Sequence, residues 1–389
     1  MRGELTWCEV SASALERNIK TLKGRLPPHT TLAVAVKSNA YGHGLELASR
    51  VFLRAGADWL CVHSLAEARA LRACGVKAPL YLFGPIAPES LDEAVSLSLR
   101  LVTYTHEQLT RLIEVCERQG RVARLHLKVE TGNHRQGLPL EELITLAKRV
   151  HAHPLLELEG LSSHFANIED TTDHSYAEHQ LRRFNEAFEA LSALNMRPRM
   201  RHIANSAASL LWPERAMEMA RVGVSAYGLW PSKDTQGVAL QRAQLAGEPP
   251  PTLTPALTWK ARVAQVKEVP TGSSVGYGCT FVTTRPSRIA VLPVGYFEGY
   301  DRGLSNTAHV LLHGRRAPVR GRVCMNMCMV DVTDIPEASL GDEAVLLGEQ
   351  VGAYGREEVS AEQVASWAGT INYEVVARIS AHLTRLEVP

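Results

Sequence analysis

The chain has 389 residues, of which 45% are hydrophobic and 21% charged, a composition typical of folded globular proteins. Its 42 lysines and arginines nearly balance its 41 aspartates and glutamates, so the charge offers no electrostatic footprint for a nucleic acid or an anionic membrane. No stretch approaches the roughly 18 apolar residues of a membrane span. We therefore expect two domains and a small-molecule substrate, with neither a nucleic-acid nor a membrane partner.

The N-terminal sequence lacks the basic stretch and apolar core of a signal peptide. The seven cysteines are odd in number and lie mostly in apolar runs, which predicts buried free thiols. Cys324 and Cys328 have no matching pair that would complete a zinc site, so we expect no metal. These features favour a reducing, cytoplasmic location.

The first 225 residues repeat a short apolar run, a turn and an amphipathic helical stretch. Eight strands alternating with helices predict an α/β fold, a parallel (β/α)8 TIM-type barrel rather than an open sheet. The strand candidates are 31–36, 58–64, 78–84, 99–105, 123–130, 158–164, 201–205 and 220–225, and the helical stretches between them include 44–56, 64–75, 105–120, 140–151 and 177–194.

The pattern changes after residue 231. Residues 232–254 are polar and proline-rich, which predicts a linker or an irregular excursion. Short β-type runs separated by turns follow from residue 255, and Ser360 with Gln363 predicts a capped helix near the end. We expect the barrel over 12–240 and a mostly antiparallel β domain over 241–389, which residues 1–11 join as a strand.

Functional residues of such barrels lie at the carboxyl ends of the strands. Lys37 follows the first strand, where burial would lower its pKa as a Schiff-base amine requires. A lysine whose amine reaches out to water is the plainer alternative. Four more strand ends carry polar or ionisable residues, which a scaffold does not require: Lys128 to Arg135, His164, Asn205 with Ser206, and Arg221.

A phosphate-binding site is a further hypothesis for these strand ends. The backbone amides of Gly223 and Val224, the hydroxyls of Ser206 and Tyr41, and a helix N-terminus would form one without net positive charge. In the β domain, Tyr277 and Tyr296 each lie beside glycines, a pattern that by itself favours turn packing.

Nine motifs occur in order along both domains and resemble alanine racemase. They are VKSNAYGHG (36–44), LKVETGNHRQG (127–137), SSHFAN (162–167), HIANSAAS (202–209), ARVGVSAYGLWPS (220–232), VGYGCTF (275–281), LPVGYFEGYDRG (292–303), GRVCMNMCMVD (321–331) and TINYEV (370–375). The resemblance implies a barrel that binds pyridoxal 5'-phosphate, a β domain, and a homodimer with shared active sites. The reaction it implies is the interconversion of L- and D-alanine, which supplies D-alanine for peptidoglycan.

The resemblance also implies a role for individual residues. Lys37 would hold the cofactor as a Schiff base and act on the α-proton of the D enantiomer, and Tyr277 of the partner subunit would act on the L enantiomer. Arg221 would face the pyridine nitrogen, and Arg135 the phenolic oxygen and the substrate carboxylate. The other cofactor and substrate contacts would be Tyr41, His164, Asn205, Ser206, Gly223, Val224 and Tyr373, with the backbone amide of Met325 reaching the carboxylate from the partner.

The implied residue types suit the chemistry. Racemisation needs an acid and a base on opposite faces of a planar carbanion, which two separate groups provide. Arginine cannot give up its proton, so Arg221 would leave the ring nitrogen unprotonated and limit transamination. A tyrosine has a pKa of about 10, and His164 held by Arg221 is a device for lowering it.

Two positions need separate comment. Lys128 lies seven residues before Arg135, where many members of the family carry a carbamylated lysine, and a plain barrel lysine is the alternative. Asn326 stands where much of the family has aspartate, so we expect neutral hydrogen bonding there and a less certain substrate preference. Tyr296 and Tyr373, which narrow the access to the site in the family, are present.

Other functions compete with this interpretation. A serine or broad-specificity racemase has the same fold, and an amino-acid decarboxylase of similar architecture would use a cysteine such as Cys324. A metal-dependent hydrolase would need matching carboxylates to accompany His151 and His153. The sequence lacks such carboxylates. A non-enzymatic binding protein would not need both Lys37 and Tyr277.

Overall fold

The computed structural model describes residues 3–389, and the chain divides into two compact units. One unit comprises residues 14–40 and 45–254, and the other comprises residues 3–13, 41–44 and 255–389. We call them the barrel unit and the β unit. No helix among residues 3–389 combines the length and the apolar character that crossing a membrane requires.

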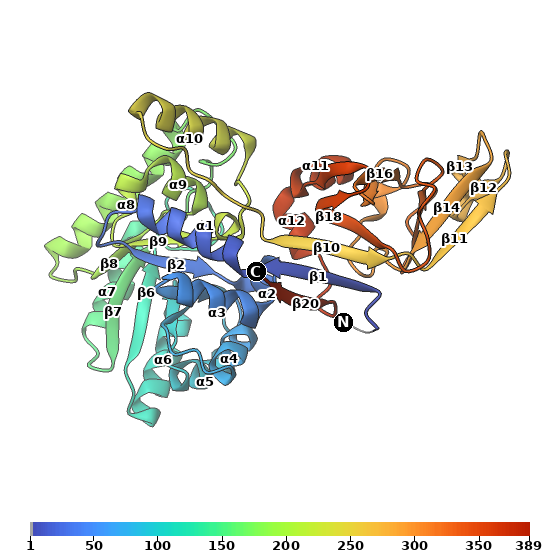
Figure 1. The fold of residues 1–389 in the computed structure, drawn as a ribbon. Helices are drawn as coiled ribbons and strands as arrows, with labels where there is room; N and C mark the ends of the chain where they lie inside the picture. The colour runs from blue at the N-terminus through green and yellow to red at the C-terminus, as the bar shows by residue number, and fades with distance from the viewer. Residues whose placement is uncertain (1–2) are drawn as a thin grey trace. The chain divides into compact units, whose positions relative to one another are not determined.

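Eight parallel strands form the centre of the barrel unit, with helices around the outside (Figure 1). The sheet order is β8-β7-β6-β5-β4-β3-β2-β9. The circle closes where the Arg221 N–H in β9 donates to the Ala204 carbonyl after β8 at 3.0 Å. The strands are β2 (Thr31–Ala35), β3 (Trp59–Val62), β4 (Leu80–Leu82), β5 (Arg100–Thr103), β6 (Ala123–Lys128), β7 (Leu156–Ser162), β8 (Met200–His202) and β9 (Met219–Val222).

The helices of the barrel unit follow the predicted alternation. Apolar residues recur at helical spacing and bury one face of each long helix, as Leu109, Leu112 and Val115 do in α6. The helices are α1 (Ala12–Arg25), α2 (Lys37–Tyr41), α3 (Leu45–Ala55), α4 (Leu65–Ala73), α5 (Leu91–Ser96), α6 (His106–Gln119), α7 (Leu140–His151), α8 (Ser175–Ala193), α9 (Ser206–Leu211) and α10 (Lys233–Ala246).

The prediction of an irregular segment over 232–254 is wrong for its first half, which forms α10. Ser232 caps this helix by accepting the Thr235 N–H at 2.9 Å, and Gly247 ends it in the left-handed conformation. Thr235, Ala239 and Ala243 are the buried positions, four residues apart. Small side chains at that spacing give a weak apolar signal, which the following prolines obscured.

The β unit is built on antiparallel pairing, with one parallel pair between β1 and β20. Its main sheet has the order β16-β15-β18-β10-β1-β20 with β19 beside β18, and a second sheet has the order β11-β14-β17. The elements are β1 (Thr6–Ser11), β10 (Leu257–Arg262), β11 (Gln265–Val269), β12 (Ser274–Val275), β13 (Phe281–Val282), β14 (Ser287–Leu292), β15 (His309–Leu312), β16 (Arg315–Pro318), β17 (Cys328–Asp331), β18 (Glu343–Gly352), β19 (Gly355–Val359), β20 (Thr384–Val388), α11 (Ala361–Ala368) and α12 (Asn372–Ala377).

The eight-stranded barrel and the antiparallel β sheets confirm the predicted fold class. The predicted capping box at α11 is also present, because Ser360 Oγ accepts the Gln363 N–H and the Gln363 side chain accepts the Ser360 N–H. All seven cysteines are free, as predicted. Four of them are buried, whereas Cys74 and Cys279 are exposed.

Candidate active site

Lys37 begins a single turn of left-handed helix at the carboxyl end of β2. Ser38, Asn39 and Ala40 have φ angles of 56°, 54° and 53°, and Tyr41 continues at 51°. This conformation costs roughly 1–2 kcal/mol for each residue that is not glycine, so surrounding contacts must hold it. The strain lies directly beside the lysine that the sequence singles out, as is common at functional sites.

One carboxylate holds the start of this turn. Glu67 Oε1 accepts the Ser38 N–H at 2.7 Å, while Glu67 Oε2 accepts the N–H groups of His63 at 2.8 Å and Ser64 at 3.1 Å. Glu67 therefore ties the residue after Lys37 to the first turn of α4. The sequence predicts the helix α4 but does not reveal this contact.

The amine of Lys37 lies among groups that favour its neutral form. Burial lowers the pKa of Lys37, the charge of Arg135 lowers it further, and Glu67 acts in the opposite direction. The Phe83 ring, whose centroid is 5.8 Å from the amine nitrogen, also favours the charged form, and burial together with Arg135 outweighs it. A lysine of lowered pKa supplies the neutral amine that attacks a carbonyl.

A Glu67→Gln variant should therefore disturb Lys37. We expect the pKa of Lys37 to fall further, because the carboxylate that raises it is lost, and the free energy of unfolding to drop by about 1–2 kcal/mol as backbone hydrogen bonds are lost. The pH dependence of amine modification in the cofactor-free protein and urea unfolding measure the two effects. Glu93→Gln is the control, since it removes an exposed ion pair with Arg69. An unchanged Lys37 pKa would contradict the assignment.

Arg221 lies on β9 and connects several strand ends. Its guanidinium donates to the carbonyls of Ser163 at 2.7 Å and His202 at 2.9 Å and to Nδ1 of His202. It also lies 3.5 Å from Nδ1 of His164. Burial and the charge of Arg221 hold the pKa of His164 well below its usual range. Because arginine can only donate a hydrogen bond, Nδ1 of His164 is the acceptor. The His164 ring is therefore neutral and carries its proton on Nε2.

Lys128 and Arg135 come from β6 and the loop that follows it. Lys128 is only 9% exposed, and its amine donates to Gln136 Oε1 at 3.1 Å. Burial, followed by the charges of Arg221 and Arg135, lowers the pKa of Lys128 to about 7. Arg135 itself is exposed. Lys37, Lys128, Arg135 and Arg221 thus make the carboxyl end of the barrel a place for anionic groups.

The predicted phosphate ligands of the barrel unit adjoin one another. Asn205 caps α9 by accepting the Ala208 N–H at 2.9 Å, and Ser206 Oγ accepts the Gly223 N–H at 2.8 Å. Val224 begins a short 3-10 helix, whose first N–H groups have no partner within the helix. The adjoining Ser225 hydroxyl is buried and makes no hydrogen bond within residues 3–389. Hydroxyls and free amides of this kind suit a phosphate.

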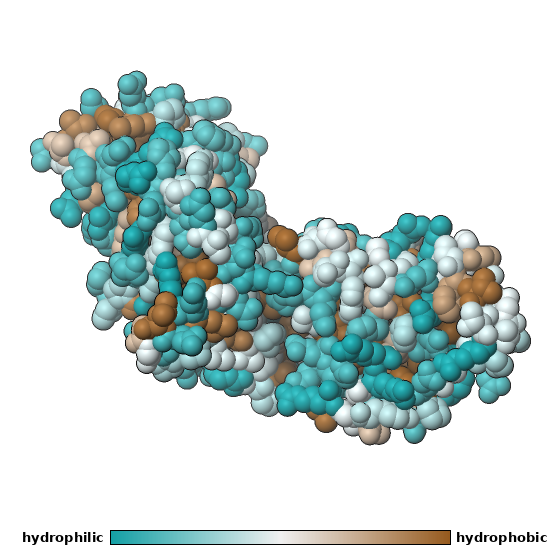
Figure 2. Space-filling model, turned by 90° about the horizontal axis from the view of Figure 1, so that it is seen from above, coloured by the Kyte–Doolittle hydropathy of each residue, from teal (hydrophilic) through white to brown (hydrophobic). Residues whose placement is uncertain are grey.

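The remaining predicted residues belong to the β unit. The rings of Tyr41 and Tyr373 pack with their centroids 6.3 Å apart. Tyr277 and Met325 line one open groove and are 73% and 56% exposed. Figure 2 shows apolar side chains gathered at the end of the β unit that carries β11 to β14 in Figure 1.

Asn326 differs from the sequence-based expectation of neutral hydrogen bonding. Its amide donates to Glu298 Oε1 at 2.7 Å, while Glu298 Oε2 accepts the Gly295 N–H at 2.8 Å. The carboxylate at this corner is thus supplied by Glu298. The Phe297 N–H donates to the Met325 carbonyl at 2.9 Å, so this turn is fastened to the segment that carries Met325.

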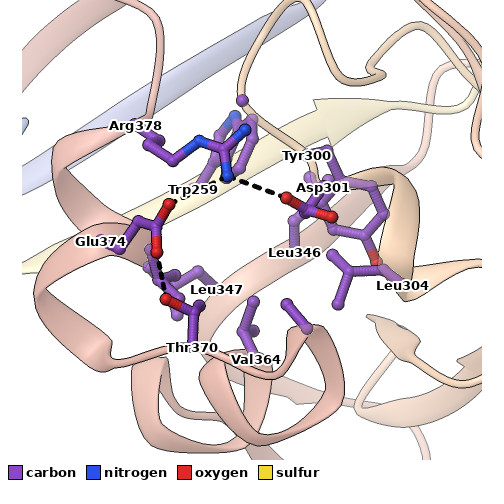
Figure 3. A pocket seen from close by; sticks show the side chains of 13 residues that line it. Trp259, Tyr300, Asp301, Leu304, Leu346, Leu347, Val364, Thr370, Glu374 and Arg378 are labelled. Atoms are coloured by element: carbon purple, nitrogen blue, oxygen red, sulfur yellow. Dashed lines mark hydrogen bonds and ion pairs between the residues drawn. The ribbon is translucent and has the colours of Figure 1, made fainter.

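A smaller pocket inside the β unit is lined in part by Glu374 and Val375 of α12, the helix that carries Tyr373 (Figure 3). Apolar side chains, among them Trp259, Leu304 and Val364, line it. Arg378 bridges its rim by donating to Asp301 at 2.9 Å and to Glu374 at 3.1 Å. The ion pair with Asp301 fastens the end of α12 to the turn before Leu304.

Both halves of the chain match models of one family. Residues 10–231 match the alanine racemase N-terminal domain and residues 256–387 the alanine racemase C-terminal domain. The chain is 38% identical over 386 residues to the alanine racemase of Desulforamulus reducens, covering 99% of each chain. It is 41% identical over 380 residues to that of Symbiobacterium thermophilum, covering 98% of this chain and 96% of the other.

Solved structures agree. The alanine racemase of Streptomyces lavendulae superposes with a TM-score of 0.89 at 33% identity, covering 100% of this chain and 98% of the other. The Bacillus anthracis alanine racemase with bound L-Ala-P has a TM-score of 0.89 at 32% identity, covering 99% and 95%. The chain therefore belongs to the alanine racemase family, whose enzymes use pyridoxal 5'-phosphate.

Proposed function

We propose that this enzyme interconverts L- and D-alanine with two bases, Lys37 on one face of the substrate and the partner subunit's Tyr277 on the other. The observation that carries the proposal is the environment of Lys37, an amine of lowered pKa at the carboxyl end of β2. Lys37 Nζ would move the α-proton of the D enantiomer, and the Tyr277 hydroxyl that of the L enantiomer.

The residues of the barrel unit fit the cofactor. When bound, pyridoxal 5'-phosphate supplies an electron sink for the negative charge that develops at the substrate Cα. Lys37 would attach it, and the amides and hydroxyls at Ser206, Gly223 and Val224, with Tyr41 and Tyr373 from the β unit, would hold its phosphate. We place Asn205 among the contacts as the cap that orients Ser206.

The charged residues would control the outcome of the reaction. Arg221 only donates, so it would leave the pyridine nitrogen unprotonated and restrain transamination. Neutral His164 would accept from Arg221 and offer its Nε2 proton to the Tyr277 oxygen, which favours the deprotonated tyrosine. Arg135 and the Met325 amide would bind the substrate carboxylate.

We also propose a homodimer that shares its active sites, because the exposed Tyr277 and Met325 face away from the β unit's own core. Free thiols throughout support a reducing, cytoplasmic location. D-alanine made there would supply peptidoglycan, which a requirement for D-alanine after gene deletion would test.

The decisive experiment incubates the holoenzyme with single L-amino acids and follows optical rotation. Alanine should lose its rotation fastest, in keeping with the L-Ala-P that the Bacillus anthracis relative binds. If serine loses its rotation as fast as alanine, the enzyme has a broad substrate specificity rather than a specificity for alanine. Constant rotation with every amino acid would overturn the proposal.

We further propose that Lys128 is carbamylated. With its pKa lowered to about 7, about half of the amine is neutral at neutral pH and more of it above, and the neutral amine can attack CO2. The N–C bond forms as one C=O electron pair moves onto oxygen, and the amine releases a proton to solvent. The product is an anion that would attract Arg135, where the protonated amine repels it.

Carbamylation should therefore rise with pH through about 7, because only the neutral amine reacts. Native mass spectrometry in bicarbonate should show about 44 Da of added mass, which is the mass of one CO2 molecule. Lys128→Ala should lower activity about tenfold, and acetate should restore part of it by supplying an anion beside Arg135. Full activity of Lys128→Ala without any added anion would contradict the proposal.

A further inference from the structure

Arg221 is a partly buried cation whose counter-charge is not adjacent. In the part of the chain that the structure describes, its partners are the carbonyls of Ser163 and His202 and the rings of His202 and His164, with no carboxylate among them. Burying an uncompensated charge is costly. A negative charge that reaches Arg221 through other groups would reduce that cost.

A chain of hydrogen bonds runs from Arg221 through the barrel interior to Glu159. His202 Nε2 lies 2.6 Å from His126 Nδ1, and His126 Nε2 lies 3.1 Å from Glu159 Oε2. Both rings are fully buried. Glu159 also accepts from Arg100 Nε at 3.3 Å, and its side chain is 12% exposed.

The proton positions in this chain follow from its two ends. Arg221 only donates, so His202 Nδ1 accepts, and burial followed by the charge of Arg221 lowers the pKa of His202 far enough to keep the ring neutral. The His202 proton is therefore on Nε2 and is donated to His126 Nδ1. Burial likewise lowers the pKa of His126, whose own Nε2 proton is donated to Glu159.

Glu159 remains the acceptor because it is ionised. Burial acts to raise its pKa, but the hydrogen bond from His126 and the charges of Arg100 and Arg124 outweigh burial and leave the pKa lowered. Every donor in the chain therefore points from the cation toward the anion, and hydrogen bonds aligned in this way strengthen one another.

The local backbone is shaped to admit this chain. Leu125 of β6 pairs with Leu158 and His126 pairs with Gly160, so Glu159 is an extra residue in β7, a β-bulge that re-aims its side chain. A Cβ at Gly160 would lie 2.2 Å from His126 Nδ1. Tyr81 packs against both imidazoles, with ring centroids 4.8 and 5.4 Å away.

We propose that Glu159 is a positioning residue for Arg221, which it orients and neutralises through His126 and His202. The kinetic consequence rests on the proposed role of Arg221 at the cofactor ring. The hydrogen-bond chain itself does not, because it is present among the residues of the protein alone.

The proton positions can be observed by NMR of the holoenzyme labelled with 15N-histidine, with His126→Asn and His202→Asn samples for assignment. Wild type should show both rings protonated at Nε2 and unprotonated at Nδ1 throughout the neutral pH range. Glu159→Met removes the acceptor, so His126 should lose its single tautomer and the His202 Nδ1 resonance should move. Glu159→Gln keeps an acceptor oxygen and should restore the tautomers.

The kinetic test uses the same variants. Glu159→Met should lower kcat about tenfold with little change in KM. The kcat of Glu159→Gln should lie between those of Glu159→Met and wild type. Glu157→Met is the matched control, because Glu157 lies two residues earlier in β7 and, among residues 3–389, pairs only with Arg124 and Arg199. In an Arg221→Lys background the Glu159 substitutions should lower kcat little further, because Glu159 acts through Arg221.

The results separate the two hypotheses. If both imidazoles keep their tautomers in Glu159→Met, or if kcat falls equally in Glu157→Met, the positioning role of Glu159 is wrong. If wild type does not racemise amino acids while the tautomers respond as described, the proposed function fails and the hydrogen-bond chain stands.

Discussion

Lys37→Ala protein should neither attach the cofactor covalently nor racemise alanine. Lys37 is the amine of lowered pKa at the carboxyl end of β2, and alanine has no atom to replace Nζ. Activity should fall by at least about 10⁴-fold, because covalent attachment and one of the two bases are lost together. Visible absorbance of the bound cofactor and loss of optical rotation measure the two effects.

Lys23→Ala provides a control, since Lys23 forms an exposed ion pair with Asp58 on the outside of the barrel. It should retain absorbance and activity. Free methylamine added to Lys37→Ala should restore part of the proton transfer if only the amine is missing. A Lys37→Ala protein that keeps the covalent absorbance would show that another lysine holds the cofactor.

Tyr277→Phe should separate the two functions that Lys37 combines, which are attachment of the cofactor and proton transfer. Tyr277 is 73% exposed in the β unit, so removal of its hydroxyl should not affect folding. Cofactor absorbance should stay as in wild type, while racemisation falls about 10²–10⁴-fold, the usual contribution of one acid–base group. Exchange of the α-proton with D2O should be lost more severely from L-alanine than from D-alanine.

Mixing the two variants tests whether the tyrosine comes from the partner. If it does, a mixed dimer of Lys37→Ala and Tyr277→Phe subunits has one intact site. After unfolding and refolding of an equal mixture, about a quarter of wild-type activity should return, because about half of the dimers are mixed and half of their sites are intact. No recovery would place both bases in the same subunit. Equal protein amounts of each variant refolded alone are the control.

The barrel could be predicted from the sequence because each strand and helix carries its own periodic signal. Eight apolar runs separated by amphipathic stretches correspond to β2 to β9 within a few residues. The helix α10 was not predicted from the sequence because the residues at its buried positions, Thr235, Ala239 and Ala243, are small. Their stripe contrasts little with the polar residues around it, so tertiary packing decides the conformation.

The side chains at the strand ends were also predictable, but their partners were not. Alternation along β6 already puts His126 on the same side as Lys128, and both are buried. That His126 meets His202 and Glu159 depends on pairing across β7 and on one extra residue there, which no local pattern reveals. The contact between Glu67 and Ser38 joins separate strand–helix units and is equally non-local.

The left-handed turn after Lys37 also limits how this segment can vary. Only glycine, asparagine and aspartate adopt such φ angles readily, and a branched side chain such as valine fits them worst. Bulky or branched residues at positions 38 to 40 should cause misfolding. Selection should therefore remove them because of the folding defect, before any effect on catalysis. Glycine at Ser38 or Ala40 would relieve the strain and would free the backbone that fixes the lysine in place.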